Sequence, residues 1–407
     1  MNDSLPPLSP DDPSLRPQIR VAPGMSRRLR RGHPWLFSNE IEMTPEARAL
    51  PSGVLVTIID AGGERLGVGT FNPHSLIAVR LLDRDDSVTI TQTFLESRLR
   101  AALALRDLVV ASPSVRIVHS EADGLPGLVL DRFGSVVVCQ VNTAGMERLL
   151  PDLLLAVRSV LDPAAIFLDN ATPVRSLEGL ESYRRVALGA VDGPVELEEN
   201  GVRFLVDVTS GQKTGWFHDQ RDNRAFMARL ARGRSVLDLF SYTGGFALQA
   251  AVAGASHVTA VDRSGHALAL AQLAADLNGV GASCRFVEAE AFAEMTRLRE
   301  TGERFGIVLC DPPAFVKSRK DLASGLKGYR KMARMAADLV EPEGFLFVAS
   351  CSHHVPAEAF AEEITRGVFL SGRSSRILKV SGAAPDHPLH PALPESAYLK
   401  SIVLHLR

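Results

Sequence analysis

Three carboxylates and one thiol in the second half of the chain each stand at the end of a short apolar run: Asp238, Asp262, Asp311 and Cys351. Asp238 precedes a turn that contains glycine, and Asp262 follows Gly244 by 18 residues (262 − 244 = 18). This spacing is close to the roughly 20 residues that place an acid on a ribose hydroxyl in nucleotide-binding sheets. The pair therefore indicates a nucleoside-type cofactor, although two aspartates that simply end strands of an unrelated α/β fold would give the same pattern.

The turn after Asp238 narrows the choice of cofactor. Gly244 and Gly245 let the backbone approach a ligand closely, but the full G-x-G-x-x-G pattern is missing. A pyrophosphate needs uncharged hydrogen-bond donors where this chain has the carboxylate of Asp238. We therefore expect a cationic or amine-bearing ligand, and S-adenosylmethionine fits better than NAD.

Asp311 is followed by Pro312 and Pro313, which fix the backbone just after the carboxylate. A carboxylate held rigidly at a strand end can grip a planar base that carries an amino group; a Pro-rich turn with a solvated Asp is the alternative. In methyltransferases of exocyclic amines the residue after the second proline is usually aromatic. This chain has Ala314 there and Phe315 one position later, which argues against amine methylation.

Cys351 follows an apolar run and lies between two serines. Carbon 5 of a pyrimidine is a poor nucleophile, and attack of a thiolate on carbon 6 is the known way to activate it. Neighbouring cations or oriented backbone donors lower the pKa of such a thiol. A cysteine of the apolar core is the alternative for Cys351, and Cys310 is the competing nucleophile, although its unbroken apolar strand predicts that it points inward.

The other thiols and the histidine pair predict no metal site. Cys139 and Cys284 read as structural, and the four cysteines are too far apart for a C-x-x-C pair, a structural zinc site or a disulfide framework. They indicate a reducing compartment. His353 and His354 have no third ligand nearby and are interpreted as loop residues.

Alternating strands and helices must position these groups. After Asn200-Gly201 the pattern predicts strands at 235–239, 257–261, 283–287, 306–309 and 344–349, with helices at 246–253, 265–277, 291–300 and 329–340. This order is typical of an α/β fold with a doubly wound, Rossmann-like parallel sheet. Ligands bind such a sheet at the carboxyl ends of its strands.

Two smaller modules are expected before this sheet. Residues 1–17 read as a disordered tail, and residues 18–92 contain short strands broken by glycines, which indicates a small β-barrel. Residues 93–200 combine a helix at 94–110 with strands and turns, which predicts a middle α+β domain. The last domain is then 201–407.

The composition is that of an ordinary globular protein of two or three domains, with 407 residues, 46% hydrophobic and 23% charged residues. The net charge of −2 gives the whole chain no attraction for nucleic acid, so binding of a polyanion must be local. Two stretches supply local charge: the arginines from Arg20 to Arg31, and the lysines and arginines from Lys317 to Lys331. The start of the chain is polar and no run of 18 apolar residues occurs, so we expect neither export nor a membrane span.

The segment from Ser210 to Arg224 packs polar, aromatic and basic side chains, including Lys213, just before the sheet. So dense a mixture favours a binding edge over a capped surface helix. At this point the chain resembles a known family, the PUA-domain class I methyltransferases that form 5-methylcytosine in bacterial large-subunit ribosomal RNA. The resemblance covers nearly the whole chain after the tail and rests on these stretches: Arg31–Phe37, Ser120–Gly127, Asp131–Gly134, Gly211–Gly215, Asp219–Arg221, Asp238–Phe246, Asp311–Pro313 and Ser350–Ser352.

The resemblance implies that Cys351 is the nucleophile and that Asp311 holds the cytosine. It also implies a site for S-adenosylmethionine, to which we assign these residues: Asp238, Phe240, Ser241, Tyr242, Thr243, Gly244, Gly245, Asp262, Ser264, Asn278, Glu290, Asp311 and Gln220. Glu290 stands where relatives often have Asp. Contacts with RNA are expected from Arg27, Arg28, Arg30, Arg31, Lys213, Lys317, Lys320 and Lys327.

The expected activity is methylation of carbon 5 of a ribosomal cytosine by a cytoplasmic enzyme. A related group of cytosine methyltransferases carries a second cysteine directly after its Asp-Pro-Pro-type turn. This chain has Ala314 there, so the proton acceptor of the release step stays unassigned. A guanine-N7 or exocyclic-amine methyltransferase is the second interpretation, and a catalytically idle RNA-binding assembly factor is the third. Homodimerisation, the modified nucleotide and the form of the RNA substrate stay open.

Overall fold

The computed structural model describes residues 11–211 and 214–407, and its chain divides into two compact units. Of the described residues, the first unit contains 11–193, 208–211, 214–215 and 385–394, and the second contains 194–207, 216–384 and 395–407. Short segments that fall inside the predicted last domain, 208–211, 214–215 and 385–394, therefore pack with the first unit, while residues 194–200 belong to the second. Within the described residues, no helix is both long and apolar enough to span a membrane.

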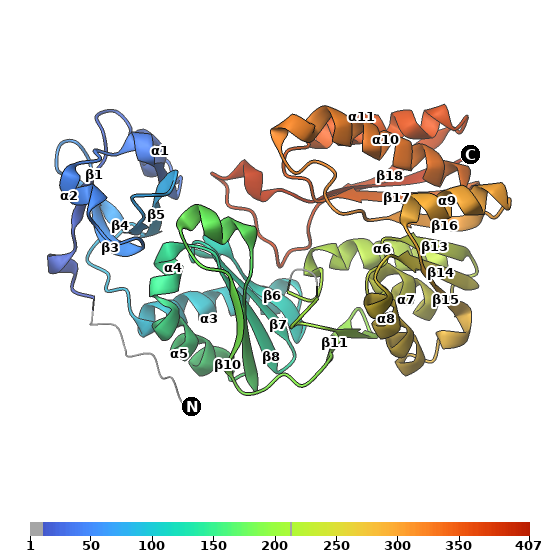
Figure 1. The fold of residues 1–407 in the computed structure, drawn as a ribbon, viewed down its shortest axis with the longest axis horizontal. Coiled ribbons are helices and arrows are strands. Elements are labelled where there is room, and N and C mark those ends of the chain that lie inside the picture. Colours follow the sequence, from blue (N-terminus) through green and yellow to red (C-terminus); the bar gives the residue numbers. More distant parts are fainter. Residues whose placement is uncertain (1–10, 212–213) are drawn as a thin grey trace. The chain divides into compact units, whose positions relative to one another are not determined.

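The first unit holds two sheets of five strands each (Figure 1). The first sheet has the order β1-β3-β4-β5-β2, and its strands are β1 (Gln18–Arg20), β2 (Trp35–Phe37), β3 (Val54–Ile59), β4 (Arg65–Phe71) and β5 (Ile77–Asp83). Two short helices accompany it, α1 (Arg27–Arg30) and α2 (Pro45–Arg48). The glycine-punctuated strands expected between residues 53 and 82 are confirmed.

The second sheet of the first unit has the order β10-β9-β8-β7-β6. Its strands are β6 (Ser114–His119), β7 (Leu128–Phe133), β8 (Val136–Val141), β9 (Ala165–Asn170) and β10 (Tyr183–Leu188). Its helices are α3 (Gln92–Val109), α4 (Ala144–Arg148) and α5 (Leu150–Leu161). Leu95, Leu99 and Ala102 of α3 are buried at helical spacing in the core of this sheet, as the sequence predicts.

The second unit is built on a seven-stranded sheet of order β15-β14-β13-β16-β17-β19-β18. Its strands are β13 (Ser235–Leu239), β14 (His257–Asp262), β15 (Cys284–Glu288), β16 (Phe305–Cys310), β17 (Val340–Ser350), β18 (Ser375–Ser381) and β19 (Lys400–Leu406). The first five are parallel, whereas β19 runs antiparallel to both β17 and β18. The strand order reverses between β13 and β16, which is where doubly wound sheets bind ligands.

Helices cover both faces of this sheet (Figure 1). Residues of α9 (Ala291–Glu300), α10 (Leu322–Asp338) and α11 (Ala357–Leu370) share one core with the strands, and residues of α6 (Arg221–Ala231) and α7 (Gly245–Val252) share the core of the other face. The unit also contains α8 (Gly265–Leu277) and the hairpin β11 (Val195–Glu199) and β12 (Val202–Val206). The predicted α/β fold is confirmed, and α10 begins earlier than the expected residue 329.

Candidate active site at the carboxyl edge of the sheet

Asp238 organises the turn between β13 and α7. Its side chain is buried, and Oδ2 accepts hydrogen bonds from Ser241 Oγ (2.7 Å) and from the backbone N–H of Ala247 (3.0 Å). Burial raises the pKa of Asp238 to about 7, against these hydrogen bonds and with the help of the nearby charges of Asp311 and Asp262. The edge of the sheet therefore carries a carboxylate that lacks a compensating positive charge.

Asp262 fixes the same turn from the neighbouring strand. One carboxylate oxygen accepts the backbone N–H of Tyr242 and the other that of Ser264, each at 2.9 Å. Phe240 and Tyr242 have left-handed backbones, with φ of 63° and 52°, before Gly244 at 80°. Such conformations typically cost about 1–3 kcal/mol each for non-glycine residues and concentrate at functional sites. The strain in this turn and the hydrogen bonds of Asp262 support the prediction that the turn residues and Asp262 bind the cofactor.

Asp311 follows β16 at the same edge and is half-buried. Its Oδ2 accepts a hydrogen bond from Nε2 of Gln220 (3.0 Å), and Gln220 Oε1 accepts one from Asn223 Nδ2 (2.7 Å). Gln220 ends the short 3-10 helix His218–Gln220 and is buried. The structure thus brings the predicted residue Gln220 into contact with the predicted base-binding acid.

A buried ion cluster around Glu199 holds the segment that presents Gln220. The carboxylate of Glu199 accepts hydrogen bonds from Arg224 Nε (2.6 Å), Trp216 Nε1 (3.0 Å) and Gln249 Nε2 (2.9 Å). Burial pushes the pKa of Glu199 up, but the guanidinium groups of Arg224 and Arg221 outweigh it, so the pKa lies below its usual value. This carboxylate, unlike Asp238, is compensated by cations of the chain itself.

The four thiols have different environments. Cys351 directly follows β17 and is half-buried, whereas Cys310 is fully buried in the core, where burial raises its pKa far above the usual value. The prediction that Cys310 points inward is confirmed. Cys139 is buried in the first unit with a pKa raised to about 12 by burial, and Cys284 begins β15 and so lies at the opposite edge of the sheet. Cys310 and Cys351 thus both stand at the carboxyl ends of their strands, but only Cys351 of these two is not fully buried.

Hydroxyl groups connect the Cys351 turn with the loop after Asp311. Ser350 Oγ donates to Tyr329 Oη (2.8 Å), and Tyr329 Oη lies 2.9 Å from Ser352 Oγ. Ser352 Oγ also accepts the backbone N–H of Val316 (3.3 Å). Phe315 packs on Tyr329, with ring centroids 4.6 Å apart, so the aromatic side chain after the double proline is occupied within the protein.

The remaining predicted cofactor residues divide into two groups. Ser264 and Glu290 cap the helices that leave the carboxyl edge, accepting the backbone N–H groups of Ala267 (3.2 Å) and Ala293 (2.9 Å). Thr243 is buried in the strained turn, and its hydroxyl has no hydrogen-bond partner among the described residues. Asn278 differs from the expectation.

Asn278 follows the last residue of α8, a helix that starts at the carboxyl edge and runs back to the other side of the sheet. Its side-chain N–H₂ donates to the carbonyls of Arg203 and Ala274 (2.7 Å each), and its Oδ1 accepts the N–H of Arg203 (3.0 Å). These contacts tie α8 to β12. We therefore correct the expectation and leave Asn278 out of the cofactor site.

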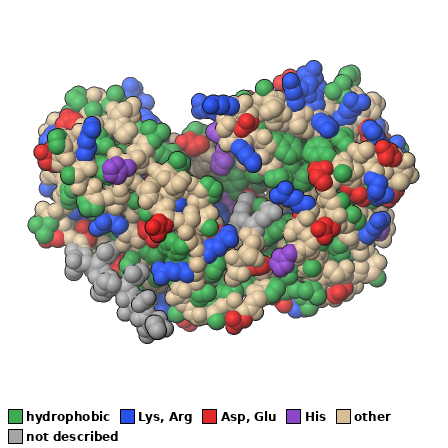
Figure 2. Space-filling model, in the orientation of Figure 1, with side chains coloured by type: hydrophobic (Ala, Val, Ile, Leu, Met, Phe, Trp, Pro, Cys, Tyr) green, Lys and Arg blue, Asp and Glu red, His purple; other side chains and the backbone are tan. Residues whose placement is uncertain are grey.

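The predicted RNA-contacting residues are exposed, but part of their charge is compensated. In the first sheet Arg28 pairs with Glu40 (3.0 Å), and Arg30 pairs with Asp60 (2.8 Å) and Glu64 (2.7 Å). Arg27 and Arg31 are exposed and form no ion pair with any described residue. Lys317, Lys320 and Lys327 are also exposed, and Figure 2 shows Lys and Arg side chains gathered over the region of α10 and α11. Lys213 lies outside the described residues.

Two further residues lie beside the site and were not singled out from the sequence. Tyr398 Oη donates to the carboxylate of Asp219, and the Tyr398 ring lies 5.3 Å from that of His353. Lys400 is buried and donates to the carbonyls of Ser352 and Val355. The available signal for Lys400 was a single lysine at the start of a mostly apolar strand.

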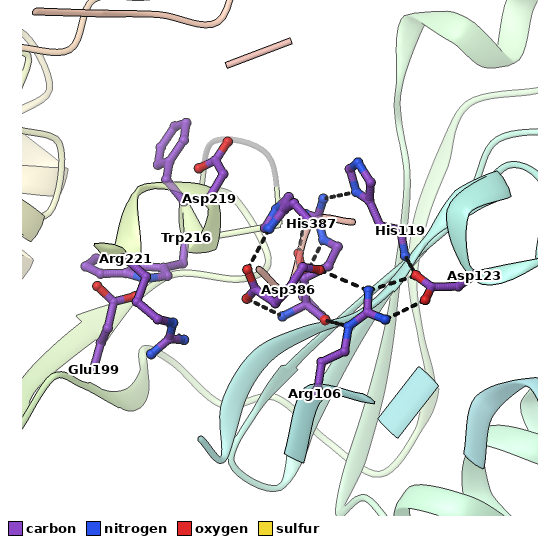
Figure 3. Close-up of polar contacts among 12 residues, drawn as sticks. Arg106, His119, Asp123, Glu199, Trp216, Asp219, Arg221, Asp386 and His387 are labelled. Atoms are coloured by element: carbon purple, nitrogen blue, oxygen red, sulfur yellow. Dashed lines mark hydrogen bonds and ion pairs between the residues drawn. The ribbon is translucent and has the colours of Figure 1, made fainter. Parts of the chain in front are cut away.

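The first unit contains a second buried polar cluster, around Arg106 (Figure 3). Arg106 Nη2 donates to Asp123 Oδ2 (2.8 Å) and to the carbonyl of Asp386 (2.9 Å), and Nε donates to the carbonyl of Arg116 (2.9 Å). Asp386 also contacts His387 (2.8 Å). No motif or spacing in the sequence connects residues so far apart. Since the carboxylate of Asp123 is paired with the guanidinium of Arg106, the cluster reads as structural.

Comparison with known proteins agrees with this architecture. Residues 188–397 match a family model of S-adenosylmethionine-dependent methyltransferases, and residues 19–84 match a PUA-like domain. The chain is 35% identical over 395 residues to ribosomal RNA large subunit methyltransferase I of Photobacterium profundum, covering 96% of this chain and 99% of that protein. It is also 35% identical over 396 residues to the protein of the same name from Klebsiella pneumoniae 342, with coverage of 95% and 98%.

Solved structures show the same fold. A SAM-dependent methyltransferase of Streptococcus mutans superimposes with a TM-score of 0.79 at 20% identity, covering 96% of this chain and 100% of that one. A methyltransferase structure in complex with SAH, the product of the methyl donor, gives a TM-score of 0.80 at 20% identity and the same coverage. At this identity the likeness concerns the fold alone.

Proposed function

Because this chain belongs to the ribosomal RNA large subunit methyltransferase I family of S-adenosylmethionine-dependent methyltransferases, we propose that it methylates carbon 5 of a cytosine in large-subunit ribosomal RNA. The observation that carries the proposal is the position of Cys351. It is half-buried at the carboxyl edge that also holds Asp238, Asp262 and Asp311, while Cys310 is sealed in the core. Such a substrate places the enzyme in the cytoplasm.

The acids at this edge fit S-adenosylmethionine, which supplies the methyl group from a sulfonium and carries an ammonium group. Within the described residues, neither Asp238 nor Asp262 forms an ion pair with a lysine or arginine of the chain. A buried carboxylate without a cation is costly, and a bound cation relieves that cost. Gly244 adopts a φ of 80°, which glycine accepts readily, and so it shapes the turn that follows Asp238.

The residues of this chain divide the proposed reaction between them. Asp311 accepts a hydrogen bond from the amino group of the cytosine and so orients the ring. The thiolate of Cys351 adds to carbon 6, which forms a C–S bond and moves the ring electrons to carbon 5, where the methyl group is accepted. A base then takes the proton from carbon 5, and the electrons of that C–H bond re-form the double bond between carbons 5 and 6 and expel the thiolate of Cys351.

The residues around Pro312 and Pro313 support a ring carbon, and not an exocyclic amine, as the atom that accepts the methyl group. Phe315 packs against Tyr329 within the protein, and Ala314 stands directly after the prolines, so no aromatic ring there is offered to a flipped base. The exposed arginines and lysines supply a local surface for RNA. We assign this role to Arg27 and Arg31 in the first unit and to Lys317, Lys320 and Lys327 in the second.

The proposal is tested by incubating the purified protein with labelled S-adenosylmethionine and unmodified ribosomal RNA, followed by nucleoside analysis. We expect label in 5-methylcytidine. Cys351→Ala should reduce turnover by about 10⁴-fold or more, because the nucleophile is lost. The same variant should still bind S-adenosylmethionine in calorimetry.

Cys310→Ala is the matched control, since it removes the other thiol of the same sheet region from the core rather than from the edge. It should retain activity. Label on guanine N7 or on an exocyclic amine, or full activity of Cys351→Ala, would contradict the proposal. Failure to bind S-adenosylmethionine and to label any RNA would instead point to a non-catalytic RNA-binding factor.

A further inference from the structure

Lys400 lies beneath the turn that follows Cys351. It is the first residue of β19 and is paired in register with Ser350, the last residue of the antiparallel strand β17. The residue is 6% exposed, and Nζ donates to the carbonyls of Ser352 (2.6 Å) and Val355 (2.8 Å). The ammonium group therefore joins both ends of the turn that begins at the thiol.

The charge of this ammonium has no carboxylate partner among the described residues, where its recorded hydrogen bonds go to neutral carbonyls. A buried cation without an anion is unfavourable, so the site would be stabilised by a negative charge next to it. Burial lowers the pKa of Lys400, and the charge of Cys351 acts in the opposite direction. The two side chains thus attract each other when the thiol is ionised.

We infer that Lys400 is a positioning residue for the nucleophile: it closes the turn after Cys351 and, through its positive charge, favours the thiolate form of that cysteine. The inference rests on the proposed function, because that function requires Cys351 to ionise to a thiolate. It adds the source of the activation, which the acids of the edge cannot supply since they disfavour a second anion.

Other titratable groups surround the turn in the described part of the chain. Tyr329 of α10 is held by Ser350 and Ser352, and burial raises its pKa, with the Cys351 charge acting in the same direction. Asp311 follows the adjacent strand β16, and His353 stands within the turn against Tyr398. Of the lysines and arginines in the described residues, Lys400 is the one hydrogen-bonded to this turn.

The experiment measures the rate at which iodoacetamide alkylates Cys351 as a function of pH, with the Cys351 peptide quantified by mass spectrometry. It uses the full chain, and it requires neither RNA nor turnover. We expect the wild-type midpoint to lie below the value of about 8.5 typical of an ordinary thiol. In Lys400→Met the midpoint should rise by about one pH unit, which is about a tenfold loss of thiolate at neutral pH.

Two variants separate charge from shape. Lys400→Arg keeps the positive charge and should keep the midpoint near that of the wild type. Tyr329→Phe removes the hydroxyl that holds the other side of the same turn without changing the charge, and it should move the midpoint much less than Lys400→Met. Equal shifts in Tyr329→Phe and Lys400→Met would overturn the inference, because turn geometry alone would then explain both.

The wild-type chain decides the matter if Lys400→Met fails to fold: a midpoint at or above about 8.5 would overturn the inference. Failure of the proposed function looks different. If Cys351→Ala methylates RNA normally while the alkylation midpoint depends on Lys400, the nucleophile assignment is wrong but the effect of Lys400 on the thiol stands. If Cys351→Ala is inactive and Lys400→Met has the wild-type midpoint, only the inference about Lys400 fails.

Discussion

The Arg106 cluster of the first unit and the acidic sheet edge of the second are both built from buried polar groups, yet they balance their charges differently. Asp123 is held by the guanidinium of Arg106, as Glu199 is held by Arg224. Asp238 is held by a hydroxyl and a backbone N–H, and its pKa is raised to about 7 by burial. The charges of the first arrangement are balanced within the chain, whereas we propose that a cation of the bound cofactor balances those of the second.

Removing the arginine of the Arg106 cluster should change stability the most. Arg106→Met leaves the carboxylate of Asp123 buried without its cation and should lower the free energy of unfolding by about 3–5 kcal/mol. Urea unfolding of the full chain measures this. The control is Arg100→Met on the same helix, whose exposed pair with Glu96 should contribute no more than about 0.5 kcal/mol. Similar losses in the two variants would remove the distinction.

Asp238→Asn tests the acidic sheet edge of the second unit. The pKa of Asp238 is higher in the folded chain, about 7, than the usual 3.8, so this group contributes stability below about pH 4 that is lost as the pH rises through about 7. Without cofactor, the stability of Asp238→Asn relative to wild type should therefore increase over that range. Urea unfolding at several pH values checks this expectation.

The same titration should appear in cofactor affinity. Since the ionised carboxylate attracts a cation, the affinity of the wild type for S-adenosylmethionine should rise by up to about tenfold per pH unit below about pH 7 and then level off. Asp238→Asn should lose this rise and bind about 10–100-fold more weakly at pH 8. Calorimetry across this pH range decides; a parallel pH dependence in both proteins would assign the titration to another group.

Removing a single exposed arginine should have a small effect on RNA binding. Arg31 forms no ion pair with a described residue, while Arg28 is paired with Glu40. Arg31→Gln should weaken binding to ribosomal RNA by about two- to fivefold and reduce the slope of log affinity against log salt by about one. Arg28→Gln should do less in the same filter-binding series. Equal losses would show that the ion pair does not withhold Arg28 from RNA.

The sequence predicted the structure best where the functional residues stand at the ends of regular strands and helices. The strand 235–239 and the helix 265–277 have the predicted bounds, because their apolar period and their flanking turn residues are local signals. Asp238, Asp262, Asp311 and Cys351 could be placed at one edge because each ends a strand of a parallel sheet. That inference needed only the order of elements, which a single sequence contains.

The groups that complete these sites could not be found in the same way. Lys400 reaches the Cys351 turn because β19 runs against β17, and Asp386 reaches Arg106 across 280 residues of chain. The arginine-rich stretch near the start looked purely basic, since the acids that pair with Arg28 and Arg30 lie on later segments. The correction for Asn278 has a different cause. Asparagine is a plausible residue type for a cofactor site, but position 278 lies at the end of α8 that is far from the carboxyl edge of the sheet.

The position of β19 between β17 and β18 also has a consequence for the order of synthesis. β19 is synthesised after every other strand of its sheet, although it does not lie at the edge. One side of β17 therefore has no partner strand while residues 351–399 are added. Asp386 arrives equally late in the Arg106 cluster. A translating ribosome that stalls before residue 385 therefore leaves a chain in which β17 has an open side and Arg106 lacks the carbonyl of Asp386. An open strand is a feature that chaperones and proteases can recognise.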